Sequence, residues 1–217
     1  LINLYTQQFP NPGEEIEKEL ETIELDYVRE DFPKIIRAMK DSGDRITSIS
    51  KSLRTFSRTD AENKQRFNLR EGIESTVLIL RHRLKANDQR PDIEVITDYG
   101  EIPEVNCFPG QLSQVFMNLL ANAIDAFDDT SQDSSFTEIQ AHPYQISIQT
   151  SLDNDKVKIV ISDNGPGMSE AVKNKVFDHL FTTKAAGKGT GLGLAIAQQI
   201  IVEAHDGTLD VQSQLGQ

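Results

Sequence analysis

The stretch 114–126 (QVFMNLLANAIDA) constrains the fold of this chain more than any other segment. Apolar side chains recur in and around it at three- and four-residue steps, which places them on one face of an α-helix that must pack against a core. They are Leu112, Val115, Phe116, Leu119, Leu120, Ala123, Ile124 and Phe127. The opposite face carries Asn118, Asn122 and Asp125. A solvated face is the common explanation, but asparagine competes for backbone hydrogen bonds in mid-helix, so two at this spacing need a further reason.

Charge and cysteine usage limit the partners and the location. The 217 residues carry a net charge of −12, whereas proteins that bind nucleic acid through its backbone display basic patches. We therefore expect no nucleic-acid partner, and any nucleotide must be held locally by backbone amides or a metal ion. The single cysteine, Cys107, excludes an intrachain disulfide framework and fits a reducing compartment, so we expect a cytoplasmic protein. No apolar run is long enough to cross a bilayer, so no membrane segment is expected.

The first part of the chain carries a seven-residue repeat of mostly apolar residues. One series is Phe32, Met39, Ile46 and Leu53, and the other is Ile35, Ser42, Ile49 and Phe56. A seam this narrow requires partner helices, which favours a helical bundle or coiled coil over a helix that lies on the neighbouring domain. The polar run 57–65 (SRTDAENKQ) then predicts a linker to a second domain.

The second part mixes helical and strand patterns. Helices are expected over 70–86, 109–126 and 191–204, and strands over 67–69, 93–97, 105–108 and 208–213. The segments 145–150 and 156–162 alternate like the strands of a hairpin, with turn residues at 153–155. The polar segment 128–143 is expected to be an irregular surface excursion. The order lacks regular βαβ alternation and predicts an α+β fold, a two-layer α/β sandwich of a mixed sheet packed on helices.

A first glycine cluster follows directly after the expected strand 156–162. Asp163 ends the strand, and Gly165 and Gly167 follow it. A carboxylate in this place can accept a hydrogen bond from the exocyclic amine of a nucleobase, and the glycines let the backbone turn closely against a ligand. An ordinary loop between a strand and a helix fits the pattern equally well.

A second, denser glycine cluster opens the expected helix 191–204. Its members are Gly187, Gly189, Gly191 and Gly193. Free backbone N–H groups at the start of a helix bind phosphate oxygens without a large positive charge, which agrees with the acidic composition. The cluster is neither a dinucleotide fingerprint nor a GxxxxGK[ST] phosphate loop. A flexible linker fits less well, because the glycines run directly into an apolar helix.

The segment between the two clusters, 168–186, is predicted to be a lid. It has a glycine cluster at each end, and a segment of this length that is hinged at both ends is typical of a loop that closes over a ligand. Phe177 and Phe181 lie four residues apart within it and are candidates to anchor it on the core.

Four segments, NLLANAIDA, DNGPGM, FDHLFTTK and GKGTGLGLAI, occur in this order. They resemble the N, first glycine, F and second glycine boxes of the ATP-binding domain of sensor histidine kinases, in the gyrase and histidine-kinase ATPase superfamily. The segment 32–58 (FPKIIRAMKDSGDRITSISKSLRTFSR) is similar to the second helix of the dimerisation and phosphotransfer hairpin, in a style seen among cyanobacterial-type kinases. The resemblance covers nearly the whole chain.

The resemblance implies a domain division and a set of ATP-binding residues. Residues 1–58 are expected to be part of the dimerisation hairpin, mainly its second helix, 59–66 a linker, and 67–217 the ATP-binding catalytic domain, preceded by a long dimerisation helix. ATP and Mg²⁺ are the implied cofactors: Asn122 gives its amide oxygen to Mg²⁺, and Asp163 receives the adenine amino group. The implied ATP-binding residues are Asn118, Asn122, Asp125, Asp163, Gly165, Gly167, Met168, Phe181, Thr182, Thr183, Lys184, Gly187, Gly189, Thr190, Gly191, Leu192 and Gly193.

The chain departs from the family in lacking the phosphoacceptor box, a histidine followed by an acidic residue on the first hairpin helix. The four histidines are His82, His142, His179 and His205, and none has that context. We expect His82 and His142 on the surface, His179 in the lid and His205 at the C-terminal cap of a helix. No catalytic residue is therefore assigned within the chain, and the acceptor is expected upstream of Leu1, in a longer protein.

The leading interpretation is the ATP-binding catalytic region of a two-component sensor histidine kinase. It would donate the γ-phosphate of Mg·ATP to the upstream histidine, and the phosphate would pass on to an aspartate of a response-regulator receiver domain. The implied partners also include a second copy of the chain, bound through the hairpin helices, and an upstream sensor domain. This chain alone is expected not to autophosphorylate.

Two alternatives remain open. The first is an ATP hydrolase of the gyrase or mismatch-repair type, in which the family places a glutamate where Asn118 stands, to activate water. The second is a non-catalytic scaffold that dimerises without using nucleotide.

Overall fold

The structure, a computed structural model, describes residues 63–131, 135–184 and 191–216, together with 8, 9, 11, 13–22, 27, 30–37, 39, 40 and 43 of the first part. The chain divides into two compact units, Leu1–Ser48 and Ile49–Gln217, each of which is described by itself.

The first unit is helical wherever its backbone is described over several residues in a row. Helix α2 spans Glu14–Thr22, and residues 30–37 are also helical. Phe32, Ile35 and Met39 of the predicted seam are 59%, 50% and 66% exposed. These apolar side chains are thus exposed to solvent in the single chain, as expected for a seam that packs against partner helices. The other seam positions, Ser42, Ile46, Ile49, Leu53 and Phe56, lie outside the described residues, and the predicted boundaries 1–58, 59–66 and 67–217 stay predictions.

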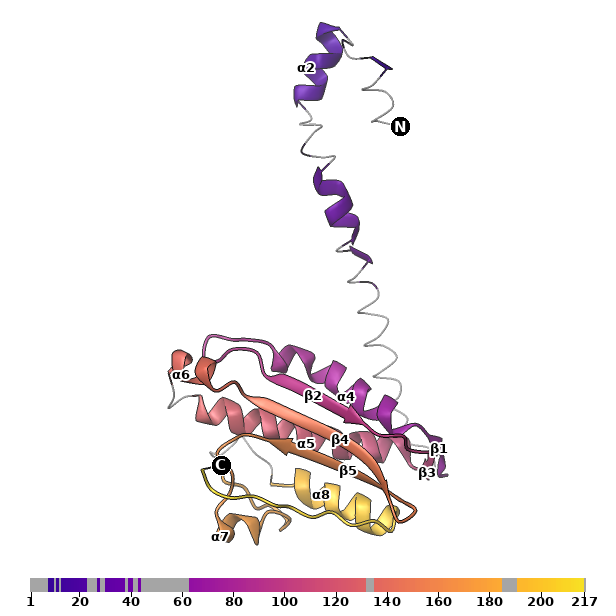
Figure 1. The fold of residues 1–217 in the computed structure, drawn as a ribbon, viewed down its shortest axis with the longest axis vertical. Helices are drawn as coiled ribbons and strands as arrows, with labels where there is room; N and C mark the ends of the chain where they lie inside the picture. The colour runs from indigo at the N-terminus through magenta and orange to yellow at the C-terminus, as the bar shows by residue number, and fades with distance from the viewer. Residues whose placement is uncertain are drawn as a thin grey trace. The chain divides into compact units, whose positions relative to one another are not determined.

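The second unit is an α+β sandwich (Figure 1). Its elements are β1 (Gln65–Phe67), α4 (Leu69–Leu84), β2 (Glu94–Tyr99), β3 (Val105–Cys107), α5 (Pro109–Thr130), α6 (Phe136–Ala141), β4 (Gln145–Asp153), β5 (Lys156–Asp163), α7 (Glu170–Lys173), α8 (Gly193–Gln199) and the π-helical turn η2 (Ile200–Ala204). The main sheet has the order β2-β4-β5, with β2 parallel and β5 antiparallel to β4, while β1 and β3 form a small antiparallel pair. The predicted two-layer fold with a mixed sheet is confirmed.

The core lies between the central strand β4 and the apolar face of α5. Ile146 and Ile148 alternate along β4 and are 1% and 0% exposed, so one face of this strand is fully covered. Phe127 of α5 is 0% exposed and stacks on Tyr144, with ring centroids 4.4 Å apart. The predicted apolar face of α5 is confirmed, because Leu112, Val115, Phe116, Leu120, Ala123, Ile124 and Phe127 are all buried and Leu119 packs against them.

The segment that follows α5 was predicted wrongly. We expected irregular chain over 128–143, but α5 continues to Thr130 and α6 forms a further short helix. The cause is a capping box: the Ser135 hydroxyl accepts from the Glu138 backbone N–H, and the Glu138 carboxylate accepts from the Ser135 N–H at 2.9 Å. Ile139 is 4% exposed, so the helix also contributes to the core.

The predicted final strand, 208–213, is also wrong as a strand. The segment keeps a period-two burial pattern, in which Leu209 and Val211 are half-buried and Thr208 and Asp210 are exposed, but it forms no ladder with the sheet within the part of the chain that is described. It is joined instead to the first glycine loop, because Ser213 Oγ accepts from Met168 N–H at 2.8 Å, and just beyond the segment Gly216 N–H donates to the Pro166 carbonyl at 2.8 Å. The predicted alternation of buried and exposed residues is correct, whereas the predicted pairing of this segment as a strand is not.

Cys107 yields a prediction about pH. The side chain is 0% exposed, and burial raises the pKa of its thiol from 9.0 to about 11, against a smaller opposing effect of Lys64. A thiol that binds its proton more tightly in the folded state stabilises the fold below its unfolded pKa. We expect the free energy of unfolding to fall between about pH 9 and about pH 11, measured by urea denaturation as the difference between wild type and Cys107→Ala. A difference that does not vary over this range would contradict the prediction.

Candidate functional site

The polar face of α5 meets the start of α8. Asn118 is half-buried, and its Nδ2 donates to the Gly193 carbonyl at 2.9 Å. A Cβ on Gly193 would lie 3.5 Å from the Asn118 amide carbon, so this position has ordinary van der Waals contact with the amide. The structure thus joins a residue of the first motif to a residue of the last, 75 positions apart. Within the described part of the chain, the Oδ1 atom of Asn118 accepts no hydrogen bond.

A lysine from the end of the F box reaches the same face one turn further on. Lys184 Nζ donates to Asn122 Oδ1 at 3.3 Å and to Asp125 Oδ2 at 2.5 Å. The side chains of Lys184 and Asp125 are 23% and 31% exposed. The structure therefore brings these three predicted site residues together, with a cation beside the amide oxygen of Asn122.

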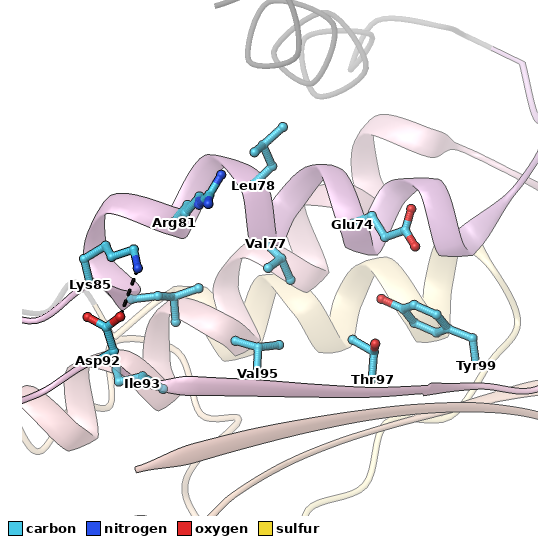
Figure 2. Close-up of a pocket in the computed structure, with 11 residues that line it drawn as sticks. Glu74, Val77, Leu78, Arg81, Lys85, Asp92, Ile93, Val95, Thr97 and Tyr99 are labelled. Carbon is cyan, nitrogen blue, oxygen red and sulfur yellow. Dashed lines mark hydrogen bonds and ion pairs between the residues drawn. The ribbon is translucent and has the colours of Figure 1, made fainter. Parts of the chain in front are cut away.

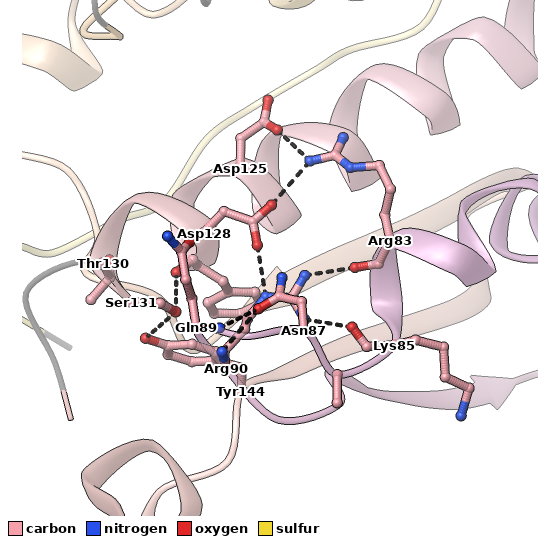
Figure 3. Close-up of polar contacts among 12 residues, drawn as sticks. Arg83, Lys85, Asn87, Gln89, Arg90, Asp125, Asp128, Thr130, Ser131 and Tyr144 are labelled. Carbon is pink, nitrogen blue, oxygen red and sulfur yellow. Dashed lines mark hydrogen bonds and ion pairs between the residues drawn. The ribbon is translucent and has the colours of Figure 1, made fainter. Parts of the chain in front are cut away.

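Asp125 is also bound from α4 (Figure 3). Arg83 Nη2 donates to Asp125 Oδ1 at 2.5 Å and to Asp128 Oδ2 at 3.3 Å. Burial opposes ionisation of Asp125, but the hydrogen bonds from Lys184 and Arg83 outweigh it, and the pKa of this carboxyl lies below its usual value. Asp125 is thus held as an anion between two cations.

Arg90 anchors the other end of this cluster. Its side chain is 1% exposed, and Nε donates to Asp128 Oδ1 at 2.7 Å. The remaining nitrogens donate to backbone carbonyls: Nη2 to Arg83 at 2.6 Å, and Nη1 to Lys85 and Pro91 at 3.2 Å each. Arg83, Arg90 and Asp128 were not among the predicted residues, because no local spacing links α4 to α5 across 42 positions of sequence.

The first glycine loop closes at the end of β5. Asp163 is exposed, and its Oδ1 accepts from Gly165 N–H at 3.0 Å, which leaves Oδ2 without a partner among the described residues. Gly165 is buried, and a Cβ there would lie 3.5 Å from the Phe127 ring, so the loop packs on α5. Asn164, which the sequence did not single out, fixes the loop to β4: its Oδ1 accepts from Gln145 N–H at 2.8 Å.

Two positions in the predicted set require glycine. Gly167 has φ +68°, and a Cβ there would lie 1.9 Å from the Gln214 carbonyl oxygen. Gly191 has φ +64°, and its Cβ would lie 2.4 Å from the Leu180 carbonyl carbon. The second contact packs the glycine cluster directly on the backbone of the F box. At both positions, glycine allows a close approach of two backbone segments that a side chain would prevent.

The remaining predicted residues belong to the segment between the clusters or to the helix start. Met168 N–H donates to Ser213 Oγ at 2.8 Å, and Thr182 Oγ1 accepts from Lys184 N–H at 3.2 Å. Phe181 is half-buried, Thr183 is exposed, and Leu192 occupies the N-cap position of α8. Gly187, Gly189 and Thr190 lie outside the described residues. Whether the whole set binds one ligand stays a prediction.

The donor set fits a metal ion only together with a ligand. Amide and carboxylate oxygens suit Mg²⁺, which is commonly held by few protein oxygens together with water and phosphate oxygens. Within the described residues no group of three or more His, Cys, Asp and Glu side chains is placed to hold a metal. Asn122 therefore has the chemistry of one oxygen ligand for such an ion, which would need further ligands from a bound molecule and from solvent.

His82, His142 and His205 have the predicted places, whereas the lid predicted around His179 stays a prediction. His82, His142 and His179 are exposed. His205 ends η2: its Nε2 accepts from Phe108 N–H at 3.0 Å, so the neutral ring carries its proton on Nδ1 and donates to the Ile200 carbonyl at 2.9 Å. The predicted helix cap is confirmed.

A groove of about 410 Å³ lies away from these residues, between α4 and β2 (Figure 2). Its walls are largely apolar, from Val77, Leu84 and Val95, with Tyr99 at one end and the Lys85–Asp92 ion pair at the other. None of its lining residues belongs to the predicted site. Among the helices that the structure describes, none combines the length and the apolarity that crossing a bilayer requires.

Comparison with known proteins gives a family match over the second half of the chain. The family model described as "Histidine kinase-, DNA gyrase B-, and HSP90-like ATPase" matches residues 108–217, which contain all four motifs.

Individual relatives extend the similarity. Sporulation kinase E of Bacillus subtilis (strain 168) is 31% identical over 172 residues, which are 79% of this chain and 21% of that protein. The signal transduction histidine-protein kinase AtoS of Escherichia coli (strain K12) is 32% identical over 175 residues, 78% of this chain and 25% of that protein. The chain thus spans about a fifth to a quarter of the length of these relatives.

The fold is similar to a solved structure. The crystal structure of full-length ShkA in complex with AMPPNP matches with a TM-score of 0.55 and 20% identity, covering 85% of this chain and 36% of that chain.

Proposed function

Because the chain belongs to the family of histidine kinase-, DNA gyrase B- and HSP90-like ATPases, we propose that it is the ATP-binding catalytic region of a two-component sensor histidine kinase. The resemblance to sensor histidine kinases is confirmed by these comparisons, whereas the cyanobacterial style stays a prediction. The strongest structural support for the proposal is the arrangement of Asn118 and Asn122. The amide of Asn118 is bonded to the carbonyl that starts α8, and Asn122 lies one turn away with a cation at its oxygen.

In this proposal Mg·ATP binds along the polar face of α5. Asn122 Oδ1 would ligate Mg²⁺ through one lone pair while the other accepts from Lys184, since an amide oxygen has two lone pairs. Asp163 accepts from the adenine amino group through Oδ2, since its Oδ1 is already used by Gly165. The glycines of the second cluster and the start of α8 hold the phosphates, and the segment from Met168 closes over them. Bound Mg²⁺ would neutralise phosphate charge during transfer, and the protein would supply positioning.

The phosphate acceptor in this proposal is not one of the four histidines of the chain. His205 uses both ring nitrogens in the fold, and the other three lie outside the acceptor context. The phosphate therefore goes to a histidine outside this sequence, and from there to an aspartate of a response-regulator receiver domain. We further propose that two copies of the chain associate through the exposed seam that includes Phe32, Ile35 and Met39.

An ATP hydrolase of the gyrase type is less compatible with Asn118. An amide cannot remove a proton from water, and the Nδ2 of this amide is already bonded to Gly193. We therefore expect the 217-residue chain to bind Mg·ATP, measured by calorimetric titration, without turning it over and without labelling itself from γ-³²P-ATP. Sustained phosphate release would favour the hydrolase, and an acid-labile phosphohistidine on the chain would contradict the proposed division of roles.

A non-catalytic scaffold is distinguished by binding alone. The two close glycine contacts, of Gly167 with Gln214 and of Gly191 with Leu180, pack the glycine loops on the chain's own backbone, so they are compatible with either function. A folded chain that fails to bind Mg·ATP would support the scaffold.

A further inference from the structure

Arg83 connects α4 to the proposed nucleotide site although it belongs to none of the four motifs. Its guanidinium spans Asp125 and Asp128, which are one helical turn apart on α5. Its backbone carbonyl accepts from Arg90 Nη2 at 2.6 Å. Arg83 is therefore held both at its backbone and at its head group, and its position depends on the packing of α4 against α5.

Asp125 passes this placement on to Lys184. It uses a separate oxygen for each cation, Oδ1 for Arg83 and Oδ2 for Lys184, both at 2.5 Å. The carboxylate plane is thus set by Arg83, and the plane sets where the lysine ammonium can lie. That ammonium also reaches Asn122 Oδ1 at 3.3 Å. The three side chains are between 23% and 31% exposed, so solvent screens their contacts only in part.

Arg83 can affect a phosphate-bearing ligand in two ways, and they differ in their consequences. As a bare charge, it would attract phosphate while Asp125 repels it. As a positioning residue, it would act only through Asp125, so that both residues favour binding. The geometry supports the second, because the guanidinium is engaged by two carboxylates and Asp125 stands between it and Lys184.

We propose that Arg83 is a positioning residue for the nucleotide, which holds the Lys184 ammonium beside Asn122 through Asp125. Lys184 then presents its charge where the triphosphate and its metal ion bind, instead of sampling the many rotamers of a free lysine. The inference rests on the proposed function, since it assigns the cluster to the same site.

The test is a double-mutant cycle in which Mg·ATP is titrated calorimetrically into the 217-residue chain. We expect Arg83→Gln and Asp125→Asn each to weaken binding about tenfold, and the double variant to bind no more weakly than either single variant, because both act on Lys184. Arg83→Lys should recover only part of the affinity, since it keeps the positive charge but its shorter side chain does not reach the position of Arg83 Nη2, the atom that contacts both carboxylates. The matched control is Arg70→Gln, which removes an ion pair internal to α4, to Glu74 at 2.8 Å, and should leave affinity unchanged.

Each contrary result has a separate meaning. Tighter binding by Asp125→Asn would show that charge alone matters and would overturn the positioning role. A variant Arg83→Gln that is less stable to urea but binds Mg·ATP as wild type does would make Arg83 purely structural, and would also overturn it. If wild type does not bind Mg·ATP while it is folded, the proposed function fails and this inference fails with it.

Discussion

Replacing Asn122 with alanine is expected to weaken Mg·ATP binding about hundredfold and to abolish the dependence of that binding on Mg²⁺. The amide oxygen of Asn122 is the proposed Mg²⁺ ligand on the polar face of α5, and it lies 3.3 Å from the Lys184 ammonium. Without this oxygen the metal ion keeps its phosphate and water ligands but loses its attachment to the protein. The measurement is a pair of calorimetric titrations for each protein, with Mg²⁺ and with EDTA.

The control for this experiment is Asn106→Ala. Asn106 is an exposed asparagine of β3, outside the predicted site, so its truncation should change neither titration. Affinity of Asn122→Ala for Mg·ATP equal to that of wild type would remove Asn122 from the site. A loss of affinity that persists in EDTA would mean that Asn122 contacts the nucleotide rather than the metal ion.

The largest effect on stability is expected from Arg90→Met. The change removes the hydrogen bond to Asp128 and leaves three backbone carbonyls, of Arg83, Lys85 and Pro91, without this donor. Asp128 is 33% exposed and keeps its contact with Arg83, so the cost comes mainly from the carbonyls: an acceptor left without its donor typically costs about 1–3 kcal/mol, and the three together are expected to cost about 3–5 kcal/mol. We expect a loss of this size in the free energy of unfolding, measured by urea denaturation followed by circular dichroism.

Arg66→Met is the matched control for Arg90. Arg66 pairs with Glu104 at 3.3 Å, but both side chains are exposed, at 78% and 53%, and such pairs contribute less than about 1 kcal/mol. Equal losses for the two variants would mean that the burial of Arg90 is not what makes it important. A loss below about 1 kcal/mol for Arg90→Met would mean that the freed carbonyls find other partners.

Periodicity predicted most of the fold, because burial follows it directly. The apolar stripe of α5 and the alternation of β4 each report a single buried face, and both were correct. The segment 208–213 shows the limit of the method: Leu209 and Val211 do turn inward, but a period of two does not say which strand offers the hydrogen bonds. Helix α6 was missed because its capping residues, Ser135 and Glu138, resemble polar loop residues.

The sequence pointed to candidate site residues where the pattern is local, and their role in binding stays a prediction. Asn118 and Asn122 stood out by their spacing, and the glycine clusters by their density. The Arg83–Asp125 contact joins residues 42 positions apart, and Arg90 contradicts the usual preference of arginine for the surface. Such residues are recognised only from the packed structure, because their environment is assembled by tertiary contacts.

The π-helical turn Ile200–Ala204 has a consequence for the length of the chain in this region. A π-turn accommodates one residue more than an α-turn, and each residue of an α-helix rotates the chain by about 100°. Because the wider turn absorbs its extra residue, His205 keeps the helical phase at which its Nε2 meets the Phe108 N–H at 3.0 Å. The helical phase at this end of α8 therefore determines whether the loop before α5 is held, and an insertion in the regular α-helical part, Gly193–Gln199, would rotate His205 by about 100° and break this contact.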